Sequence, residues 1–209
     1  MENENPAYSI DTVEQLEALL GEIAEASRKK EVDFVHPIYQ RWIEASPFAI
    51  LATVGPEGLD ASPRGDPEGF VAVADEKTLL LPERRGNNRA DSLRNILFDP
   101  HVALLFLIPG TGETLRVNGR ARITTAPEML ERFVVKGVPP RCVVVIEVDT
   151  VFFQCARAIH RSGLWQPPRT EHLEKVPSAG AMLAALTSGA VDGEAYDLAL
   201  PGRQRSTLY

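Results

Sequence analysis

The sequence predicts a mainly β protein, an antiparallel β-barrel with flanking helices. Six or seven short apolar or β-branched runs follow one another between residues 48 and 155. Polar turn signals such as GPEG, ADEK and PGTGE separate several of these runs, as in strands that are joined by hairpins. Because strands and helices alternate little, this pattern indicates an antiparallel barrel.

Length and charge limit what the chain can do. Its 209 residues suffice for one domain with a sizeable core. The net charge of −7 argues against binding to nucleic acid or an anionic membrane, which needs a broad basic surface. The start, MENENPAYSI, lacks the features of a signal peptide, and no apolar run reaches the length of about 18 residues that spans a bilayer. We therefore expect a cytoplasmic protein with no nucleic-acid or membrane partner.

An N-terminal helical extension is predicted over residues 1–45. Its first helix covers residues 10–30, where apolar side chains recur at helical spacing after an Asp-Thr pair that can cap the helix. Its second helix covers residues 37–45, and we interpret Trp42 on its apolar face as a packing anchor.

The predicted barrel domain covers residues 46–166. Its first two strands, 48–54 and 59–64, are expected to pair as a hairpin around GPEG. Further strands are expected at residues 70–73, 78–81, 101–108, 114–124 and 142–155, with short helices at 89–98, 127–135 and 156–159. Pro82 is expected to end the strand before it.

The segment 114–124 (TLRVNGRARIT) alternates with the two-residue period of a half-exposed strand. Its apolar residues point to one face and its arginines to the other. We interpret the arginine face as exposed and paired to acids, although Arg116 lies close enough to Thr114 to contribute to a site.

A C-terminal extension is predicted over residues 167–209, with one short helix at 179–187. The polar, proline-containing segment 166–174 is expected at the surface. The tail LALPGRQRSTLY is assigned no helix and is expected either to pack on a neighbour or to be mobile.

A turn that precedes helix 89–98 is the strongest candidate for a binding site. A helix start has unpaired N–H groups and a positive partial charge, so it suits a phosphate. Arg89 adds a guanidinium, which can donate two parallel hydrogen bonds, and Asn88 adds an amide. The alternative interpretation is a capped helix start with a solvated arginine. The surrounding charges fit a small anionic ligand better than a polymer: Arg64, Arg84, Arg85, Arg89 and Arg94, intermixed with Asp66, Glu68, Glu83 and Asp91.

No metal site and no catalytic side chain is predicted. The four histidines do not cluster with carboxylates or cysteines at metal-binding spacing. Cys142 and Cys155 lie in or beside an apolar run, and we interpret both as buried, reduced core residues.

Five motifs follow one another between about residues 46 and 166: SPRG, LLLPERRGNNR, DPHVALLF, ETLRVNGRA and RSGLW. In their order and spacing, these motifs resemble the FMN-binding split-barrel proteins of the pyridoxamine 5′-phosphate oxidase-like family. The chain looks most similar to an uncharacterised subgroup of FMN-dependent enzymes in which GNNR, DSLRNIL and GETLRVNGRA recur. The resemblance implies a six-stranded split barrel and a homodimer with one FMN in each of two grooves at the interface.

The resemblance also implies a set of cofactor-binding residues: Arg64, Gly65, Pro82, Glu83, Asn88, Arg89, Thr114 and Trp165. In the family pattern, the segment from Arg64 would meet the flavin and its phosphate, and Pro82 and Glu83 would line the ring. Asn88 and Arg89 would hold the phosphate. Read from the residues alone, Arg64 can instead be an exposed arginine at a strand end.

Two further positions carry over from the family pattern. Thr114 stands where the family has a glutamine that reaches the cofactor. Trp165 would approach the flavin from the partner chain, and its alternative role is to anchor the dimer.

The implied function is an FMN-dependent oxidoreductase that acts on a small molecule, with NAD(P)H as a candidate electron donor. The flavin supplies the hydride chemistry, so no catalytic acid is required. One alternative is a flavin- or haem-binding sensor or storage module without turnover, and another is a dimer scaffold with an empty groove. The substrate-binding Tyr, Arg and Ser of the true oxidases are not recognisable in EMLERFVVKGVPPRC, so we do not expect pyridoxamine phosphate as the substrate.

Overall fold

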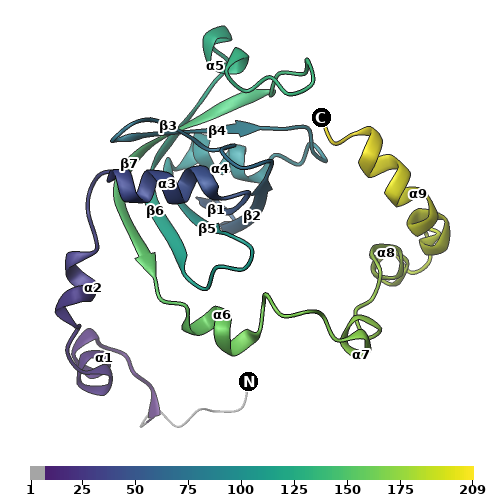
Figure 1. The fold of residues 1–209 in the computed structure, drawn as a ribbon. Helices are drawn as coiled ribbons and strands as arrows, with labels where there is room; N and C mark the ends of the chain where they lie inside the picture. The colour runs from purple at the N-terminus through teal and green to yellow at the C-terminus, as the bar shows by residue number, and fades with distance from the viewer. Residues whose placement is uncertain (1–7) are drawn as a thin grey trace.

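The computed structural model describes residues 8–209 as one curved antiparallel sheet with helices around it (Figure 1). The first seven residues, where we expect no signal peptide, lie outside the described part. The prediction of a mainly β, antiparallel fold with flanking helices is confirmed. The sheet of the described residues has seven strands, where the resemblance implied six.

The strands follow the order β2-β1-β5-β6-β7-β4-β3 across the sheet. Their bounds are β1 (Phe48–Gly55), β2 (Gly58–Gly65), β3 (Ala72–Asp75), β4 (Thr78–Glu83), β5 (His101–Leu107), β6 (Thr114–Thr124) and β7 (Cys142–Gln154). The predicted hairpin is present, because β1 and β2 pair in register up to the turn between Gly55 and Gly58.

The sheet curves around a single main core. Leu51 of β1 and Leu79 of β4 are far apart in the strand order, yet both are fully buried in one apolar cluster. Gly119 contributes to this curvature at a register shift between β6 and β7. A Cβ at this position would lie 2.2 Å from the carbonyl oxygen of Glu147, so only glycine allows the two strands to approach this closely. The two-residue alternation predicted for residues 114–124 is confirmed.

Pro82 does not end its strand, which corrects the prediction. β4 continues to Glu83, and Pro82 lies opposite Val143 of β7. On its other side β4 pairs with β3 only from Thr78 to Leu80. The missing N–H of Pro82 therefore costs no hydrogen bond on the β3 side.

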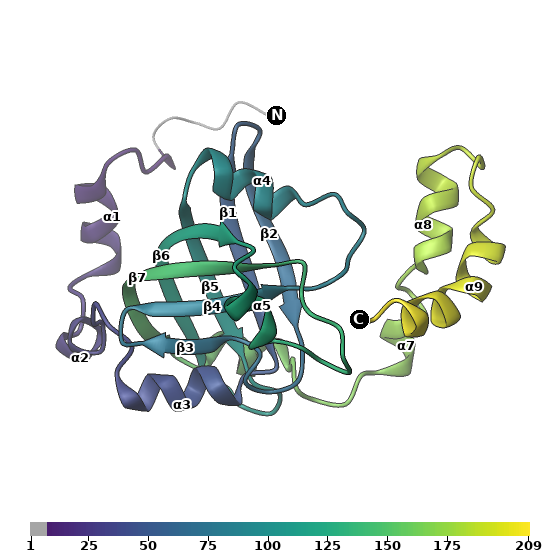
Figure 2. The ribbon, with the colours of Figure 1, turned by 90° about the horizontal axis from the view of Figure 1, so that it is seen from above.

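Two helices, α3 and α4, pack against the sheet (Figure 2). α3 (Pro37–Ala45) has the predicted bounds, and its Ile43 is fully buried in the main core. α4 (Asp91–Phe98) packs on β1 and buries Ile96. The predicted domain boundary at residue 46 would separate α3 from the core to which it contributes.

The single helix predicted over residues 10–30 is wrong. The structure has α1 (Val13–Leu20) and α2 (Glu25–Lys29). Gly21 ends α1 with a φ of 75°, and its N–H donates to the carbonyl of Glu17. Glycine adopts this positive φ without a steric penalty, so the helix can stop here.

The remaining helices are α5 (Pro127–Glu131), α6 (Arg157–Ser162), α7 (Thr170–Leu173), α8 (Ala179–Leu186) and α9 (Gly193–Ser206). α5 ends earlier than predicted. α7 and α9 were not predicted from the sequence. α9 contains Pro201 and Gly202, both unfavourable inside a helix. Among the helices of residues 8–209, none combines the length and apolarity needed to cross a membrane.

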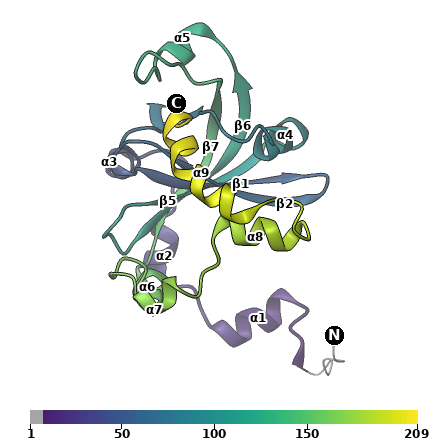
Figure 3. The ribbon, with the colours of Figure 1, turned by 90° about the vertical axis from the view of Figure 1, so that its right-hand side faces the viewer.

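The C-terminal arm, residues 167–209, stands beside the sheet rather than on it (Figures 2 and 3). Within the arm, α8 and α9 pack on each other so closely that a Cβ on Gly180 would lie 2.0 Å from the carbonyl oxygen of Gly193. Asp197 of α9 accepts a hydrogen bond from the N–H of Gly180 at 2.7 Å. The last residue, Tyr209, returns to the sheet.

Candidate functional site

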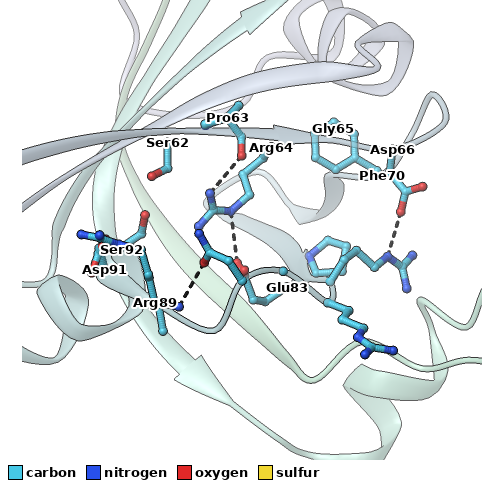
Figure 4. A pocket seen from close by; sticks show the side chains of 16 residues that line it. Ser62, Pro63, Arg64, Gly65, Asp66, Phe70, Glu83, Arg89, Asp91 and Ser92 are labelled. Carbon is cyan, nitrogen blue, oxygen red and sulfur yellow. Dashed lines mark hydrogen bonds and ion pairs between the residues drawn. The ribbon is translucent and has the colours of Figure 1, made fainter. Parts of the chain in front are cut away.

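A cavity of about 480 Å³ lies where the ends of β2 and β4 meet the loop before α4 (Figure 4). Its walls include Ser62–Asp66 of β2 and the turn after it, Pro82–Asn87, and Arg89–Ser92. β2 and β4 are not neighbours in the strand order, so the curvature of the sheet is what brings their ends together. The volume is in the range typical of small-molecule sites.

An ion pair in the middle of the cavity joins its two strand walls. Arg64 Nε donates to Glu83 Oε2 at 3.1 Å, and Arg64 Nη1 donates to the carbonyl of Pro63 at 3.0 Å. Both side chains are largely buried, with 16% and 21% of their surface exposed. Arg64 is therefore not the solvated strand-end arginine of the alternative interpretation.

The start of α4 forms one end of the cavity. Ala90 stands at the N-cap with a φ of 56°, and no side chain caps the first N–H groups. Arg89 Nε donates to Asp91 Oδ2 at 2.9 Å, and this contact raises the pKa of Arg89. The contact uses Nε, which leaves the two Nη groups for an anion beside the uncapped amides.

A buried hydroxyl network fixes α4 to β2. Ser92 Oγ donates to Asp60 Oδ2 at 2.8 Å, and Ser62 Oγ donates to the same oxygen at 3.0 Å. Asn95 Nδ2 donates to Thr53 Oγ1 at 3.0 Å and ties α4 to β1 as well. These contacts hold the helix start in place against the strand wall.

The opposite end of the cavity contains a buried acid with two partners. Asp66, whose side chain is 4% exposed, accepts from Arg84 Nε at 2.8 Å and from the Tyr209 hydroxyl at 2.7 Å. Arg84 Nη1 also donates to the carbonyl of Phe133 at 2.7 Å. The hydrogen bond to Asp66 raises the pKa of Tyr209, so its hydroxyl stays a donor.

The structure brings five of the eight predicted cofactor residues into this cavity: Arg64, Gly65, Pro82, Glu83 and Arg89. The other three lie elsewhere. Asn88 is exposed and does not line the cavity, whereas its neighbour Asn87 does. Thr114 is buried on β6 and donates to Gln154 Oε1 at 3.3 Å, and Trp165 Nε1 donates to the carbonyl of Thr111 at 2.7 Å.

Sequence reasoning missed the roles of three residues in the site. Asp66 and Arg84 belong to the charged set singled out there, but they are 18 positions apart and nothing in the sequence pairs them. Tyr209 is 143 positions from Asp66 and carried no signal at all. Only the folded chain reveals these contacts.

The two cysteines differ, which corrects the expectation that both are buried. Cys142 is buried opposite Glu83, whereas Cys155 is exposed just after β7. Burial, and then the nearby carboxylate of Glu83, raise the pKa of Cys142. In the part of the chain that the structure describes, no group of three His, Cys, Asp or Glu could hold a metal ion.

The curved antiparallel sheet with helices around it defines a class of mainly β proteins, and its cavity is lined by arginines, most of them paired with acids. Within that class, the chain belongs to the pyridoxamine 5′-phosphate oxidase family, whose model matches residues 35–155. No curated protein matches the chain.

Several solved structures are similar to this chain over about half of its length. They include HupZ from Group A Streptococcus (21% identity, TM-score 0.46, 56% of this chain and 90% of that one). An FMN-binding protein from Syntrophomonas wolfei shows 12% identity and a TM-score of 0.43 over 55% of this chain and 82% of that one. A protein from Clostridium acetobutylicum, related to general stress protein 26 and described as of the pyridoxinephosphate oxidase family, shows 13% identity and a TM-score of 0.42 (55% and 84%).

Proposed function

We propose that the chain binds FMN in the 480 Å³ cavity and acts as an FMN-dependent oxidoreductase on a small molecule. The observation that carries this proposal is the end of the cavity at α4, where Arg89 stands beside an uncapped helix start. A phosphate there would receive hydrogen bonds from backbone amides and from the guanidinium. Membership of the family supports the same cofactor.

The charges of the cavity fit one phosphate group. Three of its arginines are already paired with acids: Arg64 with Glu83, Arg84 with Asp66, and Arg89 with Asp91. Arg85 is left over, so the cavity carries a small net positive charge. That balance suits a cofactor with one dianionic group and a large neutral ring.

Different residues of the cavity would hold the two parts of such a cofactor. Arg89 and the first amides of α4 would hold the phosphate, and Pro82 with the Arg64–Glu83 pair would flank the ring. The flavin, when bound, supplies the hydride chemistry. The chain's own residues orient the ring and leave one face for the substrate, so we assign no catalytic side chain.

A homodimer would complete the site. Thr114 and Trp165 lie away from the cavity of their own chain. We propose that Trp165 reaches the cofactor of a second copy, as the family resemblance implies, and that Thr114 stands where the family has a glutamine that reaches the cofactor.

Titration with FMN tests the proposal. Flavin fluorescence and absorbance should report binding by the wild-type chain. Arg89→Ala should weaken binding about tenfold, because the phosphate would lose its guanidinium partner. Arg122→Ala, an exposed arginine on β6, is the matched control and should bind as wild type. Equal affinity in the Arg89 and Arg122 variants would refute the phosphate assignment.

Reduction of the bound flavin by a nicotinamide donor distinguishes an enzyme from a binding module. Turnover would be supported if NADPH or NADH, added without oxygen, bleaches the bound flavin. An electron acceptor should then restore the absorbance of the oxidised flavin. A bound flavin that no nicotinamide donor reduces would favour the sensor or storage alternative instead.

A further inference from the structure

The apolar side of α1 is uncovered. The structure buries no residue of this helix, and Val13, Leu16 and Leu20 are all exposed, Leu20 to 72%. Because these three residues are three and four positions apart, they lie on one face of the helix. A helix with an apolar stripe of this kind normally packs the stripe against another surface.

Acidic residues accompany this stripe. Residues 8–24 contain no lysine or arginine, and they contain four acids: Asp11, Glu14, Glu17 and Glu22. Glu17 is four positions from Val13 and three from Leu20, so it lies beside the stripe. This charge disfavours an anionic membrane or a nucleic acid as the partner of α1 and favours a basic surface with apolar parts.

A surface of that chemistry lies where Tyr209 meets the sheet. It surrounds a cavity of about 210 Å³, whose walls contain no acid and are Arg84, Arg85, Val138, Pro139, Arg141 and Tyr209. Arg84 is paired with Asp66, whereas Arg85 and Arg141 make no ion pair within residues 8–209. Val138 is exposed, and so is Leu208 beside Tyr209. We call these wall residues and Leu208 the basic patch.

The backbone holds the basic patch in place. The N–H of Arg141 donates to the carbonyl of Glu83 at the end of β4, at 3.0 Å. Val135 and Val138 pair through two hydrogen bonds. On the other side, the hydroxyl of Tyr209 donates to buried Asp66. The patch is therefore a fixed surface on which a helix can dock.

Other concave surfaces suit an acidic helix less well, because like charges across an interface are unfavourable. Three of them have acids in their walls: Asp66, Glu83 and Asp91 in the larger cavity, Glu57 and Asp60 beside α4, and Glu194 and Asp197 between α8 and α9. The arginine face of β6 is a competing surface, but its Arg120 is already paired with Asp149.

We propose that α1 of one copy docks on the basic patch of a second copy, with its apolar stripe against Val138 and Glu17 facing Arg141. Within one chain, α1 lies at the opposite end of the molecule from α5 and the segment that follows it (Figures 1 and 3). A reciprocal exchange of the two helices would close a two-fold dimer and cover both surfaces at once. The inference does not rest on flavin binding.

Disulfide trapping between two different chains tests the contact. One chain carries Leu16→Cys and the other, which is larger by a tag, carries Val138→Cys. Both also carry Cys155→Ser, so that the exposed native thiol cannot react, and they are co-expressed and then oxidised. A disulfide needs Cα atoms within about 7 Å of each other, so we expect a product that joins the two chains. The matched control replaces Val138→Cys with Leu97→Cys, an exposed apolar position on α4, and should give none.

Exchanging the two charges tests the polar part of the contact. Arg141→Glu and Glu17→Arg should each make hydrogen exchange in α1 about tenfold faster, because like charges then face each other. The chain with both substitutions should regain the wild-type rate, which loss of local structure alone would not give. Arg122→Glu, at an exposed position on β6, is the control and should leave exchange in α1 unchanged.

Several results would overturn the proposal. Trapping of Leu16→Cys by Leu97→Cys as readily as by Val138→Cys, or no trapping by Val138→Cys, would show that α1 does not dock on the basic patch. A disulfide that forms only within a single chain carrying both cysteines would place the helix on its own chain. Faster exchange in the Arg122 variant, with none in the Arg141 variant, would place α1 on β6 instead.

Discussion

The sheet and the C-terminal arm are built in opposite ways. The sheet encloses a continuous core in which residues such as Leu104 and Phe106 are almost fully buried. In the arm, α8 and α9 bury only Gly180, and leucines such as Leu198 remain 78% exposed. The arm returns to the sheet through a polar contact, the hydrogen bond from Tyr209 to Asp66.

The sheet therefore accounts for most of the stability of the fold, whereas the arm contributes to the site. Apolar burial stabilises the sheet, whereas the arm adds little buried apolar surface and contacts Asp66 in the cavity wall through one residue, Tyr209. The arm can therefore change the site without changing the fold. The following substitutions test that separation.

Substitution in the core should have the largest effect. Leu104→Ala should lower the free energy of unfolding by about 2–5 kcal/mol, because it leaves a cavity in a well-packed region. Leu198→Ala in the arm should change it by less than about 0.5 kcal/mol. Urea denaturation followed by fluorescence measures both, and similar losses would show that the arm belongs to the cooperative core.

Substitution at the contact between α8 and α9 should open the arm alone. Gly180→Ala places a methyl group against the carbonyl of Gly193 and should destabilise the helix pair by about 1–3 kcal/mol. Gly202→Ala meets nothing within 4 Å and serves as the control. Hydrogen exchange should show faster exchange in α8 and α9 for the Gly180 variant only, with strands β5 to β7 unaffected. Faster exchange in those strands would contradict the separation.

Removal of one hydroxyl should loosen the docking of the arm. Tyr209→Phe keeps the ring but loses the hydrogen bond to Asp66, which typically contributes about 0.5–1.5 kcal/mol. Limited proteolysis should then cut the segment between α6 and α8 faster, while the urea midpoint stays unchanged. An unchanged cleavage rate would show that other contacts hold the arm.

The two cysteines should report a similar contrast within the sheet, between the buried start of β7 and the exposed residue just after its end. Exposed Cys155 should react with iodoacetamide at about pH 8, whereas Cys142 should react much more slowly because burial hides its thiol and raises its pKa. The Cys155→Ser chain should leave only the slow reaction, and concentrated urea should make the Cys142 thiol react freely. Rapid native labelling of Cys142 would mean that the start of β7 separates from β4 in the native protein.

The sequence predicted most of the sheet because its signals are local. The alternation of residues 114–124 and the turn at GPEG each specify one strand or one hairpin, and both are confirmed. The prediction of one long N-terminal helix was wrong because Gly21 ends α1, although the apolar spacing continues beyond it. α9 was missed because Pro201 and Gly202 argue against a helix that nonetheless forms.

The contacts within the site were harder to predict from the sequence, because they are not local. The arginines could be singled out by composition, but their partners depend on how the sheet curves. Asp66 meets Arg84 and Tyr209 only in the folded chain. The role assigned to Trp165 concerns a second copy of the chain, and the role of Thr114 rests on the family pattern alone, so both stay predictions.

A crystal structure of the protein grown with FMN tests the central claim most directly. We expect the phosphate within hydrogen-bonding distance of Arg89 and the first amides of α4, with the ring between Pro82 and the Arg64–Glu83 pair. A phosphate bound instead by Arg85 and Arg141, or a flavin outside the larger cavity, would contradict it.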